Sequence, residues 1–200
     1  ENFISEEDRL ILLNFAKISS EDDWSIRYKK DRYIEASLNN PEKNKNLDLE
    51  VEARNKFWDD KILEIPDTHK DITNDLWNKL NLFFNGKYKL PEITTIQRQY
   101  SGSDLSVHND NGYKKNLQRA IVIYLNDDYD GGEICFKIND HFISHKPSKG
   151  DVIVFQSTRP YLHGVRKNYN GERYMIRSFW QYKYEGSQEW LENEKKYGAS

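Results

Sequence analysis

The strongest constraint on the fold is a change in hydrophobic period near Ile93. Before this residue apolar side chains recur every three or four positions, as on helices, and after it they alternate with polar ones. Turn signals divide the second part into eight short segments, which we predict to be strands: 93–100, 104–110, 118–125, 132–138, 141–145, 151–156, 159–167 and 172–182. Strands of this length and spacing predict a sandwich or jelly roll.

Three segments ahead of the strands have the pattern of amphipathic helices. The first spans 3–18 and has Ser5 in position to cap it, and the second spans 48–63. The third spans 70–84 and stops at Asn85-Gly86, a typical helix end. The apolar stripes predicted to face the core on the first and third helices are Leu10, Leu13 and Ile18, and Ile72, Leu76, Leu80 and Phe83.

The length of 200 residues suits a single domain over 1–200. We expect residues 1–90 to be mostly helical support, residues 93–182 to form the jelly-roll core, and residues 187–197 to add a short C-terminal helix. The segment 39–46 carries almost no apolar side chain, so we predict an exposed loop, with a substrate-covering lid as the alternative.

Charge and composition exclude several classes of function. A net charge of −3 without a cluster of Lys and Arg argues against a nucleic-acid-binding protein. No apolar run approaches the roughly 18 residues that cross a bilayer, and no signal-peptide pattern opens the chain, so we expect no membrane partner. The single cysteine, Cys135, fits a reducing compartment, and the predicted location is cytoplasmic.

A three-residue motif in the second predicted strand indicates a metal site. In His108-Asn109-Asp110 the first and third side chains point to the same face of a strand. A second imidazole, from His163, would complete a set of two histidines and one carboxylate. Three such ligands on one face of an octahedron leave three positions open, which suits non-heme Fe(II) that activates oxygen. We expect the other histidines, His69, His141 and His145, to be structural.

An arginine near the metal motif indicates that the site also binds a small acid. Asn170-Gly171 is a strong hairpin signal, and it predicts that the strand with His163 and the strand with Arg173 are antiparallel neighbours. The planar guanidinium of Arg173 can then grip a carboxylate close to the metal. On the same strand Arg177 shares the face of Arg173, whereas Trp180 has the opposite parity. We predict that Arg177 and Trp180 border the substrate pocket.

The order of these residues resembles the HxD…H…R signature of the Fe(II)/2-oxoglutarate dioxygenases. The surrounding segments resemble the prolyl 4-hydroxylase branch of that superfamily over about residues 93–182. The matching segments are Ala120 to Asp127 with Gly131-Gly132-Glu133, Pro147 to Phe155, His163-Gly164-Val165, and Gly171 to Tyr174 with the strand that ends at Trp180. The resemblance implies an α+β, mainly β fold: a double-stranded β-helix (jelly-roll, cupin-like) core with supporting N-terminal helices.

The resemblance also implies the roles of individual residues. Arg173 pairs with the distal carboxylate of 2-oxoglutarate, Tyr124 helps to hold the same carboxylate, and Tyr100 lines the cosubstrate pocket. Collagen-type members have Lys where this chain has Arg173, but both side chains are cations. The residues implied to ligate Fe(II), and so to form the catalytic centre, are His108, Asp110 and His163.

The implied activity is hydroxylation of a C–H bond, with 2-oxoglutarate and O2 consumed and succinate and CO2 released. Fe(II) is the implied metal, and ascorbate is a candidate reductant. Prolyl 4-hydroxylation of a proline-containing peptide or protein is the first choice. The alternatives are hydroxylation of a free amino acid or small metabolite, and a non-catalytic metal-binding jelly-roll module that binds a small acid without turnover.

Overall fold

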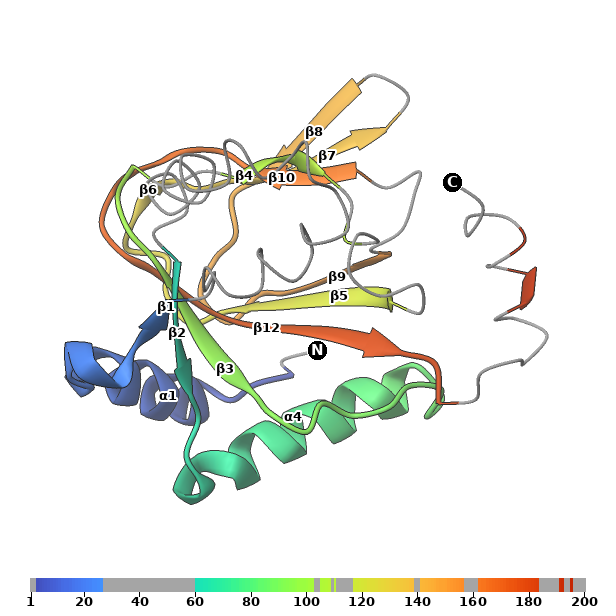
Figure 1. Cartoon of the computed structure of the whole chain (residues 1–200), viewed down its shortest axis with the longest axis horizontal. Coiled ribbons are helices and arrows are strands. Elements are labelled where there is room, and N and C mark those ends of the chain that lie inside the picture. The colour runs from blue at the N-terminus through green and yellow to red at the C-terminus, as the bar shows by residue number, and fades with distance from the viewer. Residues whose placement is uncertain are drawn as a thin grey trace, which may run out of the picture.

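The computed structural model describes residues 3–26, 60–102, 105–108, 110, 117–138, 141–156, 162–183, 191–192 and 195. Two β-sheets lie one above the other, and the two long helices lie beneath the larger sheet (Figure 1). The predicted loop at 39–46, residues 48–59 of the helix predicted at 48–63 and most of the predicted C-terminal helix lie outside the described residues. No helix among the described residues is long and apolar enough to span a membrane.

The larger sheet has six strands in the order β1-β2-β3-β12-β5-β9, and all neighbours are antiparallel. The long strand β12 lies in the middle, between β3 and β5, and makes the longest pairing with β5. The bounds of the six strands are Ser25–Ile26, Asp60–Glu64, Thr95–Gln99, Arg173–Gln181, Leu117–Tyr124 and Val152–Gln156.

The smaller sheet has four antiparallel strands in the order β4-β10-β7-β8, with bounds Leu105–His108, Leu162–Val165, Ile134–Ile138 and His141–His145. A short pair, β6 (Asp130–Gly131) with β11 (Asn168–Asn170), lies beside it. Each of the eight predicted strands therefore has a counterpart. Together with the solved structures compared below, this arrangement confirms the mainly β, double-stranded β-helix fold with supporting helices.

The two helices begin and end largely where the sequence signals place them. Helix α1 spans Glu6–Ile18, and the hydroxyl of Ser5 accepts a hydrogen bond from the backbone N–H of Asp8. Helix α4 spans Lys70–Phe83. Asn85 and Gly86 both have positive φ, and the Gly86 N–H returns to the Asn81 carbonyl at 2.7 Å, which closes the helix end. Short 3-10 turns at Glu21–Asp23 and Asp67–His69 precede β1 and α4.

The helices bury somewhat different faces from those predicted. Leu10, Ile18 and Phe83 are exposed, whereas the buried apolar residues are Leu12, Leu13 and Ala16 on α1 and Leu76, Trp77 and Leu80 on α4. Trp77 explains the rotation of α4: its ring packs 5.9 Å from that of Trp180 on β12, and its indole N–H donates to Thr94. A buried tryptophan covers more area than any other residue of the stripe, so it sets which side faces the sheet.

The prediction of a helix over 48–63 is wrong for its described part. Asp60–Glu64 forms strand β2, which pairs with β3 along its whole length. Ile62 and Leu63 are compatible with either structure, and pairing with a sheet edge outweighs the local helical pattern. The N-terminal part of the chain therefore supplies two strands of the larger sheet as well as helices.

The predicted hairpin at Asn170-Gly171 is also wrong. Strand β10 with His163 pairs with β4 and β7, and β12 with Arg173 pairs with β3 and β5, so the two strands lie in different sheets. Gly171 has φ +78°, and a Cβ there would lie 2.8 Å from the Asp128 carbonyl. The Asn-Gly pair still provides a positive φ, but the chain uses it to cross from one sheet to the other.

Candidate active site

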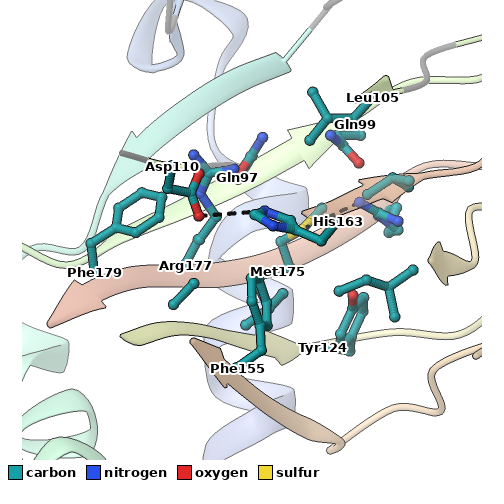
Figure 2. A pocket seen from close by; sticks show the side chains of 15 residues that line it. Gln97, Gln99, Leu105, Asp110, Tyr124, Phe155, His163, Met175, Arg177 and Phe179 are labelled. Carbon is teal, nitrogen blue, oxygen red and sulfur yellow. Dashed lines mark hydrogen bonds and ion pairs between the residues drawn. The ribbon is translucent and has the colours of Figure 1, made fainter. Parts of the chain in front are cut away.

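The predicted metal motif comes together at the end of strand β4. His108 is the last residue of β4 and is directly paired with His163 on β10, and Asp110 follows two residues later. The Nε2 atom of His108 lies 3.6 Å from Asp110 Oδ1, and that of His163 lies 3.4 Å from Asp110 Oδ2. Figure 2 shows Asp110 next to His163, with a dashed line between the carboxylate and the imidazole. The sequence spacing therefore correctly predicts this cluster.

The cluster has the composition and spacing of a metal site. One potential ligand atom from each of the three residues lies within 4.8 Å of the others, and no second group of this kind occurs among the described residues. Asp110 and His163 are buried, whereas His108 is partly exposed. The buried Oδ2 of Asp110 accepts no hydrogen bond from a described residue. Two imidazoles and one carboxylate suit Fe(II), and a cation would satisfy the buried oxygen.

Aromatic side chains hold the buried imidazole in place. The ring of Phe155 lies 4.4 Å from that of His163, and Phe136 packs edge-on against Phe155 at 5.2 Å. Phe155 is on β9 in the larger sheet and Phe136 on β7 in the smaller one. Phe155 thus packs against the His163 ring and is itself held by Phe136 of the smaller sheet, which limits the rotation of the imidazole.

Arg173 is a buried cation that faces the same cavity. It is 2% exposed, and its Nη1 donates to the Gly132 carbonyl at 2.7 Å. Its Nη2 lies 3.6 Å from the sulfur of Met175, and its Nε has no hydrogen-bond partner in the described part of the chain. None of the described carboxylates forms an ion pair with Arg173. A buried guanidinium without a counter-charge is costly, so the site favours an anionic ligand.

Tyr124 lies beside this cation as predicted. It is almost completely buried on β5, and the guanidinium carbon of Arg173 is 5.8 Å from the centre of its ring. Burial raises the pKa of the Tyr124 hydroxyl, although the charge of Arg173 opposes this effect. The phenol therefore stays protonated at neutral pH and can donate a hydrogen bond.

The cavity between the two sheets is lined by Asp110 and His163 of the metal cluster and by Arg173. Its empty volume is about 400 Å³, part of it open to solvent. The alternation predicted for β12 is confirmed, because Arg173, Met175, Arg177 and Phe179 all line it. The other lining residues are Gln97, Gln99, Leu105, Asp110, Ala120, Val122, Tyr124, Ile134, Phe155, His163 and Val165.

Two predicted pocket residues do not line this cavity. Trp180 is fully buried in the main apolar core on the other face of β12, so its predicted place at the substrate pocket is wrong. Tyr100 packs over the guanidinium of Arg98 at 4.7 Å and is also absent from the cavity wall. Alternation along β3 explains this, because Gln97 and Gln99 face the cavity and Arg98 faces away.

The sequence reasoning missed three features of the site. Gln99 is directly paired with Arg173, and Gln97 is paired with Met175, so both buried amide side chains form part of the cavity wall. Their spacing of two on a predicted strand was the available signal. Gly132 has φ +67°, and its carbonyl orients Arg173. A Cβ on Gly132 would lie 3.1 Å from the Tyr129 ring and 3.3 Å from Arg173 Nη1.

The remaining histidines have ordinary surroundings, consistent with the structural roles predicted for them. The ring of His69 packs edge-on against Phe15, and His145 lies 3.4 Å from Asp151. His141 and His145 are exposed on β8, at the free edge of the smaller sheet. None of the three belongs to the metal cluster.

Comparison with known proteins gives a family match over the jelly-roll residues. Residues 94–181 match the model of the 2OG-Fe(II) oxygenase superfamily. No curated protein matches the chain in a sequence search. The predicted resemblance to this superfamily is confirmed by this match together with the fold, and the match supports the predicted enzyme class, a 2-oxoglutarate-dependent dioxygenase, which is taken up as a proposal below. The family implies Fe(II), 2-oxoglutarate and O2 as cofactor and cosubstrates.

Three solved structures illustrate the similarity of fold. An oxidoreductase of the 2OG-Fe(II) oxygenase family from Burkholderia pseudomallei is 20% identical with a TM-score of 0.52, over 61% of this chain and 66% of that one. A Pseudomonas putida prolyl-4-hydroxylase is 16% identical with a TM-score of 0.61, over 90% and 89%. A Trichoplax adhaerens prolyl hydroxylase, in complex with a hypoxia inducible factor peptide fragment, is 19% identical with a TM-score of 0.54, over 64% of each chain.

The coverage of these structures differs. The chain spans slightly less than two thirds of the Burkholderia and Trichoplax proteins and most of the Pseudomonas protein. At identities of 20% or less, the likeness shows the fold and does not show the substrate.

Proposed function

We propose that this chain hydroxylates a C–H bond of a proline-containing peptide or protein, with Fe(II) and 2-oxoglutarate bound in the cavity between its two sheets. In the balanced reaction, the C–H substrate, O2 and 2-oxoglutarate give the C–OH product, succinate and CO2. The single observation that carries the proposal is that Asp110 and His163, two members of the two-histidine, one-carboxylate cluster, line the same cavity as a buried arginine that has no carboxylate partner among the described residues.

In this proposal His108, Asp110 and His163 bind Fe(II). The two imidazoles supply nitrogen ligands and the carboxylate supplies charge, while the packing of Phe155 against His163 keeps that ring oriented. Bound Fe(II) and 2-oxoglutarate supply the oxidative chemistry, and the protein supplies position and a shielded cavity.

Arg173 and Tyr124 bind the distal carboxylate of 2-oxoglutarate. Arg173 offers guanidinium donors that are held by Gly132, and Tyr124 offers a protonated phenol beside it. Gln97 and Gln99 add amide groups to the same wall. These contacts fix one end of the cosubstrate, so that its other end is presented to the metal cluster.

A prolyl residue in a peptide is the proposed target because prolyl hydroxylases share this fold. The Pseudomonas neighbour is described as a prolyl-4-hydroxylase, and the Trichoplax neighbour was solved with a peptide fragment. The cavity wall includes the apolar side chains of Phe155 and Phe179, which suit the aliphatic ring of proline.

The test is to incubate the full chain with Fe(II), 2-oxoglutarate and ascorbate and a set of proline-containing peptides. We expect a product 16 Da heavier by mass spectrometry, with succinate formed in equal amount. The Asp110→Ala variant is the negative control. Turnover by that variant equal to wild type would overturn the metal assignment, and hydroxylation of free proline or another small acid alone would replace the peptide by a metabolite. Binding of 2-oxoglutarate without any succinate would favour the non-catalytic module.

A further inference from the structure

Arg177 is a second cation on the cavity wall, and 2-oxoglutarate bound at Arg173 leaves it without a ligand. It lies on β12 four residues beyond Arg173 and on the same face. A strand rises about 3.3 Å per residue, so the two Cα atoms are about 13 Å apart. Arg173 pairs across the sheet with Gln99, whereas Arg177 pairs with Val122.

The two arginines lie on opposite sides of the metal cluster. Figure 2 shows Arg177 and Phe179 at the Asp110 end of the cavity, and Tyr124, the neighbour of Arg173, at the other end beyond His163. A cosubstrate that joins Arg173 to the metal therefore extends away from Arg177. The space beside Arg177 is therefore left for a substrate.

The contacts of Arg177 differ from those of arginines buried elsewhere in this chain. Arg9 is paired with Glu6 at 2.6 Å, and Arg98 is paired with Glu21 at 2.7 Å. Arg177 is partly buried, its guanidinium lies 4.7 Å from the ring centre of Phe179, and no described carboxylate is within ion-pair distance of it. The one acidic residue on the described cavity wall, Asp110, has its oxygens turned to the two imidazoles.

We infer that Arg177 binds a carboxylate of the substrate, close to the C–H bond that is oxidised. This inference rests on the proposed function and narrows its substrate class. A guanidinium that is stacked on an aromatic ring presents its N–H donors in one plane, which suits bidentate binding of a carboxylate. The neighbouring Phe179 ring orients the guanidinium of Arg177 but does not neutralise its charge.

The substrate carboxylate has two sources that share this chemistry. It is either the main-chain carboxylate of a C-terminal or free residue, or the side chain of an aspartate or glutamate next to the target. Both place one negative charge beside the reactive residue, and matched pairs of peptides separate them.

The experiment uses four short peptides with one proline each. In the first pair proline is C-terminal, as the free acid or as the amide. In the second pair proline is internal and is followed by Asp or by Asn. We measure turnover as the 16 Da product, and we measure binding to the protein loaded with Mn(II) and 2-oxoglutarate. We expect wild type to prefer one acidic member over its neutral partner by about 10–100-fold, the range of a charge-assisted hydrogen bond.

The Arg177→Gln variant should lose this preference and should retain affinity for 2-oxoglutarate. Arg177→Lys should recover part of it, because the charge remains but the bidentate geometry is lost. Arg166→Gln, which changes an exposed arginine outside the cavity, is the matched control and should behave as wild type.

Two results would overturn the inference while the proposed function stands. One is equal turnover and binding of acidic and neutral peptides by wild type. The other is a loss of 2-oxoglutarate affinity in Arg177→Gln with unchanged substrate preference, which would make Arg177 part of the cosubstrate site. Failure of the Mn(II)-loaded wild type to bind 2-oxoglutarate would instead overturn the proposed function.

Discussion

The two faces of strands β3 and β12 differ in whether a buried arginine has a carboxylate partner among the described residues. On the outer face, Arg98 is held by Glu21 at 2.7 Å and is stacked between the rings of Trp24 and Tyr100. On the cavity face, Arg173 is more deeply buried than Arg98. Its hydrogen-bond partners among the described residues are a backbone carbonyl and a sulfur atom. The two arginines sit on strands that are hydrogen-bonded to each other.

This difference separates charges that support the fold from charges that await a ligand. A paired, stacked arginine joins the N-terminal segment to the sheet, whereas an unpaired one raises the free energy of the folded state until an anion binds. The burial of a charge is thus a poor guide to function, and the presence of a counter-charge is a better one.

The largest expected effect is on the cavity face, at Asp110. Asp110→Ala should reduce 2-oxoglutarate turnover to background, because the metal loses its anionic ligand. Stability should not fall, since the substitution removes a buried carboxylate that lacks a hydrogen bond at Oδ2. Succinate release and a thermal melt of the metal-free protein measure the two effects. A large drop in Tm would mean that Asp110 supports the fold, and the contrast between the faces would fail there.

The next effect concerns Arg173. Arg173→Met should raise the KM for 2-oxoglutarate by about 10–100-fold, as expected for the loss of a charge-assisted pair, and should leave Mn(II) affinity near that of wild type. The Tm of the ligand-free protein should stay level or rise, because an uncompensated buried cation is replaced by an apolar side chain. Titration calorimetry with each ligand checks the first statement, and a parallel loss of Mn(II) binding would contradict it.

A smaller effect is expected at Gly132, whose backbone carbonyl accepts a hydrogen bond from Arg173. Gly132→Ala places a methyl group 3.3 Å from Arg173 Nη1 and 3.1 Å from Tyr129, so the guanidinium must shift. We expect a severalfold rise in the KM for 2-oxoglutarate at little change in metal affinity. Gly150→Ala is the matched control, since Gly150 also has positive φ but opens into free space. An equal rise in both variants would assign the effect to backbone strain alone.

The smallest effect is on the outer face and depends on pH. Hydrogen bonds from Lys61 and Arg98 hold the pKa of Glu21 below its ordinary value of 4.5. Glu21 therefore stabilises the fold at pH values above its ordinary pKa, and this contribution is lost as the pH falls through its lower, folded-state pKa. Wild type should be more stable than Glu21→Gln at pH 7, and the gap should close in acid. Urea unfolding of both proteins at several pH values measures the gap, and a constant difference would exclude Glu21 titration as its cause.

Much of the site could be predicted from the sequence because its geometry is local. The spacing of His108 and Asp110 and the alternation along 173–179 depend on a strand period of two, which the sequence reveals directly. The eight strands have counterparts for the same reason. The register that pairs His163 with His108 follows from the jelly-roll topology, and the family resemblance supplied that topology.

The errors arose where distant contacts decide the structure. Asn170-Gly171 favours positive φ whether the chain turns back or crosses to the other sheet, and the partners of β10 and β12 decide between them. The fate of residues 60–64 depends on the free edge of β3, which their own pattern does not reveal. Trp180 was misplaced although its parity on the strand puts it on the face opposite to Arg173.

The connection at 166–172 leads the chain from one sheet to the other, and it also sets the distance between the residues on the two cavity walls. His163 and Arg173 are only ten residues apart in the chain, yet they hold opposite walls of one cavity. The connection is pinned by β11 on β6 and by Gly131, where a Cβ would run into the Lys167 carbonyl. A connection that is fixed in this way sets the distance between the proposed metal site and Arg173. Diacids one methylene shorter or longer than 2-oxoglutarate should therefore fit poorly, and loop-length variants are the natural route to a changed choice of cosubstrate.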